Sequence, residues 1–325
     1  MSSAQPVRAT FHDFAPEPES FRDCVIAGLS LRYKELPCRF LYDERGSELF
    51  EAICETPEYY PTRTETAILA DCASEIASLM GPHCQLVEFG SGSSRKVRLL
   101  LSAFDQPSSY VAIEISREAL QQAADDVATQ FPRIDVRAVC ADYMAPLDLA
   151  EIPEPKNGRR LGFFPGSTIG NLDRAGAIHF LRRCREVVGR NGAMLVGVDL
   201  KKDARLLHAA YNDAAGITAS FTMNLLTRMN RELDADFDLT KFMHDASYNP
   251  VEGKVEIFIR SLAEQVVTVA GKRFHFRRGE GIHTEDSCKY SVTEFQSLAN
   301  RAGFASSRVW TDANDLFSTH LLIPA

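Results

Sequence analysis

The chain has 325 residues, of which 45% are hydrophobic and 25% are charged, and its formal net charge is −8. A chain of this length and composition is globular and can bury one large core or two modest ones. The acidic balance, without any basic stripe, argues against a nucleic-acid partner, and no apolar run is long enough to cross a membrane.

The first 20 residues lack the basic start and the apolar core of a secretory signal, so we expect a cytoplasmic protein. Eight cysteines are scattered along the chain without a Cys-x-x-Cys pair or a matching histidine spacing. Such cysteines are typical of reduced, mostly buried thiols, and we expect no metal site.

Short apolar segments alternate with helical ones from about residue 63 to residue 200. The predicted strands are 84–89, 109–115, 134–140, 160–165 and 193–199, and the helices between them include 96–104, 118–130 and 175–188. This alternation predicts a parallel, doubly wound sheet.

The pattern changes after residue 199. Residues 203–235 have a helical pattern, residues 253–285 alternate like antiparallel strands, and a helix near 292–302 precedes strands around 306–311 and 318–323. We therefore predict an α/β fold with two parts. The nucleotide-binding domain is predicted to comprise residues 61–199 and 287–325, and a second, α+β lobe to comprise residues 1–60 and 200–286.

A glycine-rich turn follows the first strand of the alternating region, where residues 86–94 read Leu-Val-Glu-Phe-Gly-Ser-Gly-Ser-Ser. Gly90 and Gly92 allow a sharp bend and let a ligand approach the bare backbone. Glu114 closes the next strand at about the spacing at which a carboxylate meets the ribose hydroxyls of a nucleotide. Taken alone, the pair could also be an ordinary turn and a surface glutamate.

The turn differs from a dinucleotide-binding turn in two ways. It has no third glycine, and Glu88 precedes the first glycine, where it would repel a phosphate. A cofactor with a cationic centre and no phosphate fits better, and S-adenosylmethionine is such a cofactor. Lys96, one turn into the helix, could meet its carboxylate, although a solvated helix lysine is the alternative.

Ligands in open α/β sheets bind beyond the carboxyl ends of the strands. After the third strand, Asp142 could accept from an adenine amino group while Tyr143 covers the ring; a capping aspartate beside a core aromatic is the alternative. After the fourth strand, Gly166 offers backbone polar groups. Asn171 offers a donor and an acceptor to an amino-acid carboxylate, or it caps the following helix.

Five longer segments carry a resemblance to a known family. They are Tyr42–Phe50, Pro57–Arg63, Glu88–Ser94, Gly166–Asn171 and Thr284–Lys289. In this order and with similar gaps, they resemble the L-histidine Nα-methyltransferases of ergothioneine biosynthesis, from about residue 36 to the C-terminus. The resemblance implies a Rossmann-like class I methyltransferase sheet with an added substrate-binding lobe. It also implies S-adenosylmethionine-dependent conversion of histidine to its trimethylated betaine, hercynine.

The resemblance also assigns roles residue by residue. It implies cofactor contacts from Tyr42, Gly90, Lys96, Glu114, Asp142 and Tyr143. It implies that the amino-acid end of the substrate is held by Tyr59, Gly166, Asn171 and Tyr211, and the imidazole by Glu285 and Ser287. Two positions depart from the family pattern. Glu114 replaces an aspartate, and Ile257 replaces a methionine in the wall beside the imidazole, which leaves the substrate preference less certain.

The proposed chemistry agrees with the residue types. Glu285 and Ser287 are two residues apart, so on a strand they face the same way and could clamp both ring nitrogens. Tyr42 and Tyr59 are the candidate catalytic residues, expected to orient the amine rather than to act as strong bases. Tyrosine faces also suit the quaternary ammonium that three methylations produce.

Other interpretations stay open. The chain could methylate a different amino acid or imidazole compound, or it could be a non-catalytic protein that binds a nucleoside and an amino acid. Glu88 and the missing third glycine disfavour an NAD-dependent oxidoreductase. We expect a small-molecule substrate, no nucleic-acid or membrane partner, and a monomer.

Overall fold

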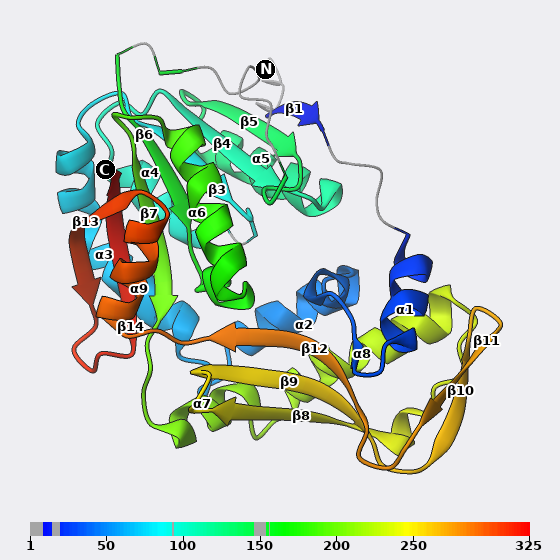
Figure 1. The fold of residues 1–325 in the computed structure, drawn as a ribbon. Helices are drawn as coiled ribbons and strands as arrows, with labels where there is room; N and C mark the ends of the chain where they lie inside the picture. Colours follow the sequence, from blue (N-terminus) through cyan, green and yellow to red (C-terminus); the bar gives the residue numbers. More distant parts are fainter. Residues whose placement is uncertain (1–8, 15–19, 93, 146–153, 156) are drawn as a thin grey trace. The chain divides into compact units, whose positions relative to one another are not determined.

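The computed structural model describes residues 9–14, 20–92, 94–145, 154–155 and 157–325 (Figure 1). Their contacts divide the chain into two units. The first unit contains the described residues of the ranges 1–17, 63–200 and 290–325, and the second contains those of 18–62 and 201–289. Within the described residues, no helix combines the length and the apolar character that crossing a membrane requires.

The first unit is built on an eight-stranded sheet with the order β1-β5-β4-β3-β6-β7-β14-β13. Its strands are β1 (Thr10–Asp13), β3 (Gln85–Phe89), β4 (Ser109–Glu114), β5 (Asp135–Cys140), β6 (Arg160–Phe164), β7 (Ala193–Asp199), β13 (Phe304–Thr311) and β14 (Phe317–Pro324). The strands from β1 to β7 in this order are parallel to one another. Strand β14 is antiparallel to its neighbours β7 and β13. The strand order changes direction between β3 and β6, which is where such sheets bind ligands.

Helices cover this sheet because each has one apolar stripe. They are α3 (Pro61–Met80), α4 (Arg95–Ala103), α5 (Arg117–Gln130), α6 (Arg174–Val188) and α9 (Val292–Arg301). In α5 the buried residues are Leu120, Ala123, Ala124, Val127 and Ala128, the spacing of one helix face. Helix α6 ends at Gly189 in a positive-φ conformation, and α6 and α9 lie beside one another (Figure 1).

The predicted doubly wound α/β sheet is confirmed, and its strands lie within one or two residues of their predicted positions. One boundary is wrong. Residues 1–60 are predicted to belong to the second lobe, but β1 pairs in parallel with β5, from Thr10 opposite Arg137 to Asp13 opposite Cys140. This four-residue strand contains a single large apolar residue, Phe11, so no hydrophobic run marks it in the sequence.

The second unit combines helices with antiparallel strands. Its helices are α1 (Phe21–Ser30), η1 (Cys38–Leu41), α2 (Glu44–Cys54), α7 (Ala204–Tyr211), α8 (Ile217–Glu232) and η4 (Leu239–Lys241). A four-stranded sheet has the order β2 (Lys34–Glu35), β12 (Gly281–Cys288), β9 (Lys254–Ser261) and β8 (Phe242–Asn249), and β10 (Gln265–Val269) pairs with β11 (Lys272–Phe276). A buried cluster that includes Leu29, Leu41, Leu225 and Ile259 joins these elements.

Two details of the second unit differ from the predicted pattern. The helical region 203–235 is broken between α7 and α8, because the Asp213 carboxylate accepts from the N–H groups of Ile217 and Thr218 and starts a new helix after Gly216. Strand β8 was not predicted, since its sequence, Phe-Met-His-Asp-Ala-Ser-Tyr-Asn, buries only two side chains.

Candidate functional site

Neighbouring parallel strands of the first unit carry the residues predicted to bind a nucleotide. Gly90 follows β3, Glu114 ends β4, and Asp142 follows β5, and these three strands are adjacent in the sheet. The N–H of Gly90 donates to the carbonyl of Ile113 on β4, 2.9 Å away. Because parallel strands end at the same edge, the structure brings these three residues together along that edge.

The glycine turn and Tyr143 are in contact distance of each other. Gly90 has φ +73°, and a Cβ atom there would lie 3.7 Å from Tyr143 Cε1. The Tyr143 ring packs edge-on against Phe164 and Phe180, with centroids 5.8 and 5.5 Å apart. Tyr143 is therefore held beside the bare backbone of the turn, as a residue that covers an adenine ring would be.

The carboxylates after β4 and β5 also bond to their own turns. Glu114 Oε1 accepts from the N–H groups of Ile115 and Ser116, at 2.8 and 3.1 Å, and burial raises the pKa of Glu114. Asp142 Oδ1 accepts from the N–H of Met144 at 2.8 Å. These bonds fix the two carboxylates at the sheet edge. The residues described after Asp142, 143–145, form a turn rather than the helix that the capping alternative requires.

The carboxyl group of Glu88 is protonated more readily than that of an ordinary glutamate. It is 2% exposed, and the Tyr110 hydroxyl donates to its carboxylate at 2.5 Å. Burial raises the pKa of Glu88 to about 7. A carboxyl with a raised pKa is more readily neutral, so the predicted repulsion of a phosphate by Glu88 is weaker than expected.

Lys96 has a partner that sequence reasoning missed. Its Nζ lies 2.5 Å from Oε2 of Glu65, a fully buried carboxylate on α3. The same oxygen accepts from the N–H of Gly166 at 2.8 Å. Glu65 therefore joins the predicted cofactor lysine to the loop after β6. Nothing in the sequence links position 65 to positions 96 and 166, although Glu65 lies just beyond the Pro57–Arg63 motif.

The loop after β6 has a constrained backbone. Gly166 has φ +79° and Ser167 has φ +58°, in the region that glycine prefers. The Ser167 hydroxyl accepts from the N–H of Asp199 at 2.9 Å, which holds the loop against β7. Asn171 ends the short helix η3 (Thr168–Asn171), whereas Asp173 caps α6. The alternative in which Asn171 caps α6 is therefore wrong.

In the second unit, the predicted imidazole clamp lies on one face of β12. Glu285 is opposite Ile257 of β9, and Ser287 is opposite Val255. Residues opposite one another in antiparallel strands share a face, so Ile257 forms an apolar floor beside Glu285. The intervening Asp286 points to the other face, where it bonds to Lys254 and His283.

A row of aromatic rings connects the predicted tyrosines with this face. The Tyr42 ring lies 5.6 Å from that of Phe50, Phe50 lies 6.3 Å from Tyr59, and Tyr59 lies 6.3 Å from Tyr211. The Tyr211 hydroxyl is 2.8 Å from the Ser287 hydroxyl. The structure thus gathers the tyrosines and the serine that are predicted to handle the substrate into one cluster of the second unit.

Tyr42 is a phenol rather than a phenolate at neutral pH. Its crowded protein surroundings and the negative charge of Glu285 raise its pKa well above 10. Tyr42 can therefore donate or accept a hydrogen bond but cannot serve as a resident strong base.

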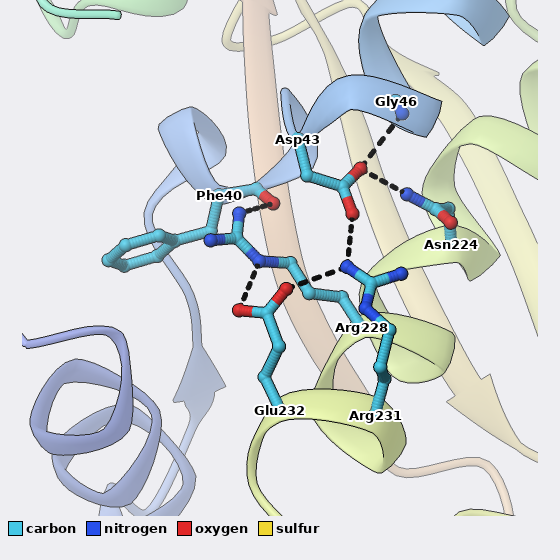
Figure 2. Close-up of polar contacts among 7 residues, drawn as sticks. All are labelled: Phe40, Asp43, Gly46, Asn224, Arg228, Arg231 and Glu232. Atoms are coloured by element: carbon cyan, nitrogen blue, oxygen red, sulfur yellow. Dashed lines mark hydrogen bonds and ion pairs between the residues drawn. The ribbon is translucent and has the colours of Figure 1, made fainter.

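Asp43 fixes the segment that carries Tyr42 (Figure 2). Its Oδ1 accepts from the N–H of Gly46 at 2.8 Å, which caps α2, and from Asn224 Nδ2 on α8 at 2.7 Å. Its Oδ2 accepts from Arg231 of α8 at 2.8 Å. Figure 2 also shows Arg228 and Glu232, which extend this network along α8 to the carbonyl of Phe40.

Sequence reasoning also missed Lys289. Its side chain is buried, with the residue 2% exposed, and its Nζ lies 2.8 Å from both the Ser287 and the Tyr211 hydroxyl oxygens. A signal was present, because Lys289 closes the Thr284–Lys289 motif two residues after Ser287. That spacing places both side chains on the same side of an extended chain.

Comparison with known proteins gives one family. A family model described as "Histidine-specific methyltransferase, SAM-dependent" matches residues 21–324. The chain is 39% identical over 310 residues to the histidine N-alpha-methyltransferase of Mycolicibacterium smegmatis, covering 94% of this chain and 95% of that protein. It is 33% identical to "Ergothioneine biosynthesis protein 1" of Neurospora crassa, covering 89% of this chain and 33% of that longer protein.

A solved structure shares the fold at low identity. A possible exported protein of Bordetella parapertussis superposes with a TM-score of 0.52 at 13% identity, covering 88% of this chain and 83% of that one. At this identity the likeness concerns the fold alone.

Proposed function

The chain belongs to the histidine-specific, S-adenosylmethionine-dependent methyltransferases, and on that premise we propose that it methylates the α-amino nitrogen of L-histidine. The product of three transfers is hercynine, so the reaction is a step of ergothioneine biosynthesis. The proposal rests on one observation: Glu285 and Ser287 lie on the same face of β12, and Ile257 of β9 lies opposite Glu285 on that face.

The first unit fits the cofactor. Gly90 presents bare backbone in a positive-φ turn, and a Cβ atom at Gly92 would meet none of the described residues within 4 Å, which suits a ligand lying against the turn. We propose that Glu114 binds the ribose hydroxyls, that Asp142 and Tyr143 hold the adenine, and that Lys96 binds the carboxylate. When bound, S-adenosylmethionine supplies a methyl group on a positively charged sulfur.

The second unit fits the histidine side chain. A carboxylate and a hydroxyl two residues apart on one strand face match the two nitrogens of an imidazole, and Ile257 offers an apolar surface to the ring. An apolar side chain would displace water from these two groups and form no hydrogen bond to either, at a cost of roughly 1–3 kcal/mol each. This clamp selects the substrate. We propose that Tyr59, Gly166, Asn171 and Tyr211 hold the amino-acid end.

Tyr42 and Tyr59 are proposed to orient the amine. An α-amino group has a pKa of about 8, so the neutral nucleophile is accessible near pH 7 without a strong base. This agrees with the raised pKa of Tyr42, which keeps its phenol protonated. The faces of the tyrosine row would also accommodate the growing quaternary ammonium.

A panel of free amino acids tests the proposed specificity. Purified protein is incubated with S-adenosylmethionine and one amino acid at a time, and release of S-adenosylhomocysteine is measured. Histidine should be turned over at least about 100-fold faster than phenylalanine or leucine, because these side chains form no hydrogen bond to Glu285 or Ser287. Similar rates across the panel would contradict the assignment of the β12 face. A monomeric state and a cytoplasmic location remain predictions.

A further inference from the structure

Glu65 is a fully buried carboxylate near the start of α3, in the same unit as the glycine turn. Its Oε2 atom accepts two hydrogen bonds, from Lys96 Nζ of α4 at 2.5 Å and from the N–H of Gly166 at 2.8 Å. Lys96 Nζ also lies 3.9 Å from the position that a Cβ atom on Gly166 would take. A single oxygen atom therefore holds both the lysine of α4 and the loop after β6.

The sheet leaves space for this carboxylate at Gly197 of β7. A Cβ atom on Gly197 would overlap Glu65 Oε1 and would lie 3.1 Å from Phe317 Cε1. The φ angle of Gly197 is not in the left-handed region, so its backbone conformation does not require glycine. Glycine inside a strand weakens the strand, and it often marks a position where another group approaches closely. At Gly197 that group is the Glu65 carboxylate.

Stability alone is a weak reason for this arrangement. Glu65 Oε1 is buried and has no hydrogen-bond partner among the residues that the structure describes. A buried polar atom without a partner costs stability, and apolar residues of similar volume often replace a buried ion pair without loss. The arrangement therefore favours a role for Glu65 in holding the two groups that Oε2 binds.

The two partners of the ion pair differ in exposure. The side chain of Glu65 is 0% exposed, whereas that of Lys96 is 13% exposed. The lysine is therefore the partner that a ligand can reach, with the carboxylate behind it. The Nζ atom of a lysine carries more than one N–H, so the bond to Glu65 leaves at least one donor for a ligand.

We propose that Glu65 is a positioning residue that holds the Lys96 amino group ready for the carboxylate of S-adenosylmethionine. A lysine side chain that is ordered only when the ligand binds lowers the affinity, because its rotamer freedom is lost at that moment. Glu65 orders the side chain beforehand. This inference rests on the proposed role of Lys96, and it adds a residue that does not itself touch the cofactor.

The test uses two ligands that differ at the amino-acid end. S-adenosylhomocysteine has the carboxylate that Lys96 is proposed to bind, whereas 5′-methylthioadenosine has the same nucleoside and a thioether but no amino-acid end. Dissociation constants of both are measured by titration calorimetry. The ratio of the methylthioadenosine constant to the homocysteine constant reports the contribution of the amino-acid end. A variant that only loosens the nucleoside site weakens both ligands equally and keeps this ratio.

Glu65→Leu should lower this ratio by at least about threefold, because Lys96 loses its anchor and must be ordered by the ligand. Leucine has a similar size and offers no acceptor. A smaller fall would overturn the inference. A rise would overturn it as well, since it would mean that Glu65 competes with the ligand for Lys96. Glu75→Leu is the matched control on the same helix: Glu75 pairs with Arg308 of the edge strand β13, and its loss should keep the wild-type ratio.

A second variant covers the case in which Glu65→Leu does not fold, as judged by thermal unfolding. Glu65→Gln keeps the volume of the side chain and one acceptor oxygen. A neutral oxygen binds a lysine more weakly than a carboxylate does, so the ratio should fall by at least about twofold. A folded Glu65→Gln protein with the wild-type ratio would overturn the inference.

Lys96→Met shows whether Glu65 acts through the lysine. This variant should lower the ratio at least as much as Glu65→Leu does. Adding Glu65→Leu to Lys96→Met should then change the ratio by less than about 1.5-fold, because the anchor has nothing left to hold. A larger fall in the double variant would mean that Glu65 acts by another route, and it would overturn the inference alone. A wild-type ratio in Lys96→Met would overturn the proposed role of Lys96, and the inference with it.

Discussion

Two glutamates of this chain show how residue environment sets the state of a carboxyl group. Glu88 ends a buried strand and receives a hydrogen bond from Tyr110, and burial raises its pKa to about 7. Glu285 lies half-buried on β12, on the face that carries Ser287. The first carboxyl therefore influences stability, whereas the second is the one that we propose binds the imidazole.

Glu88→Gln should remove a pH dependence of stability. The folded protein holds the Glu88 proton more tightly than the unfolded chain, whose carboxyl has a pKa of about 4.5. The contribution of Glu88 to stability is therefore fully present below about pH 4.5 and falls as the pH rises through about 7, by at most about 3 kcal/mol. Urea unfolding of the cofactor-free protein at about pH 5 and about pH 8 should show this fall in the wild type and not in Glu88→Gln.

A surface glutamate provides the comparison for Glu88. Glu186 has a side chain that is 62% exposed, so Glu186→Gln should keep the wild-type pH dependence. The assignment of the raised pKa to Glu88 fails if Glu88→Gln and Glu186→Gln lose the same stability between the two pH values.

Glu285→Ala should weaken histidine binding and leave the cofactor unaffected. Loss of a hydrogen bond to a charged group costs about 1.5–3 kcal/mol, which corresponds to a roughly 10- to 100-fold higher dissociation constant for histidine. Titration calorimetry with each ligand measures both effects. Glu256→Ala is the control, since Glu256 pairs with Lys254 on the other face of the sheet. Unchanged histidine affinity in Glu285→Ala would rule out the clamp.

At the scale of elements, short segments between helices and strands set the position of the candidate site. The turn from β3 to α4 holds Gly90 against Tyr143, and the start of α2 holds Tyr42 next to α8 through Asp43. Both depend on local backbone chemistry that a single substitution can remove.

Gly90→Ala should weaken S-adenosylmethionine binding by at least about tenfold. The Cβ atom has ordinary contact distances to Tyr143 and Phe164, so the cost comes from the positive φ, roughly 1–2 kcal/mol, and from a methyl group on the surface where a ligand would press. Gly189→Ala carries the same kind of strain at the end of α6, where a Cβ atom would meet nothing within 4 Å. It should lose similar stability and keep cofactor affinity. Equal cofactor affinity in both variants would refute the placement of the cofactor at this turn.

Asp43→Ala should destabilise the protein by about 2–3 kcal/mol, because it removes the cap of α2 and two bonds to α8. Burial favours the protonated form of Asp43, but bonds from Arg231, Gly46 and Asn224 outweigh it and lower the pKa. The contribution is therefore present above about pH 4 and is lost as the pH falls below the folded pKa.

Asp43→Asn separates the cap from the charge in the same network. The amide oxygen can still cap α2, so denaturant unfolding should show a loss of only about 1 kcal/mol. If Asp43→Asn were as damaging as Asp43→Ala, the cap would not be the dominant contribution. Histidine affinity should fall in Asp43→Ala more than in Asp43→Asn. Tyr42 directly precedes the N-cap residue of α2, so a shift of that helix end would also move Tyr42.

At the scale of the whole molecule, most of the first unit could be predicted from the sequence. Its parallel strands are buried on both faces, so each reads as a short apolar run, and the helices between them carry a clear apolar stripe. The positions of Gly90, Glu114 and Asp142 along one edge follow from that order alone. The face shared by Glu285 and Ser287 follows equally from strand periodicity.

What could not be predicted depends on contacts between distant residues. The ion pair of Glu65 with Lys96 joins positions 31 residues apart, and Arg231, one of the partners of Asp43 on α8, is 188 residues away from it. Strand β1 is too short, and β8 too polar, to give a periodic signal. The position of Lys289 beside Ser287 could have been predicted, because two residues separated by one other lie on the same side of an extended chain.

The central claim is that histidine is methylated on its α-amino nitrogen, and mass spectrometry with methyl-labelled S-adenosylmethionine tests it most directly. Histidine incubated with the purified protein should gain one, two and then three labelled methyl groups, and fragmentation should place all of them on the α-nitrogen. A folded protein that binds S-adenosylmethionine yet leaves histidine unlabelled, or that labels a ring nitrogen, would contradict the account.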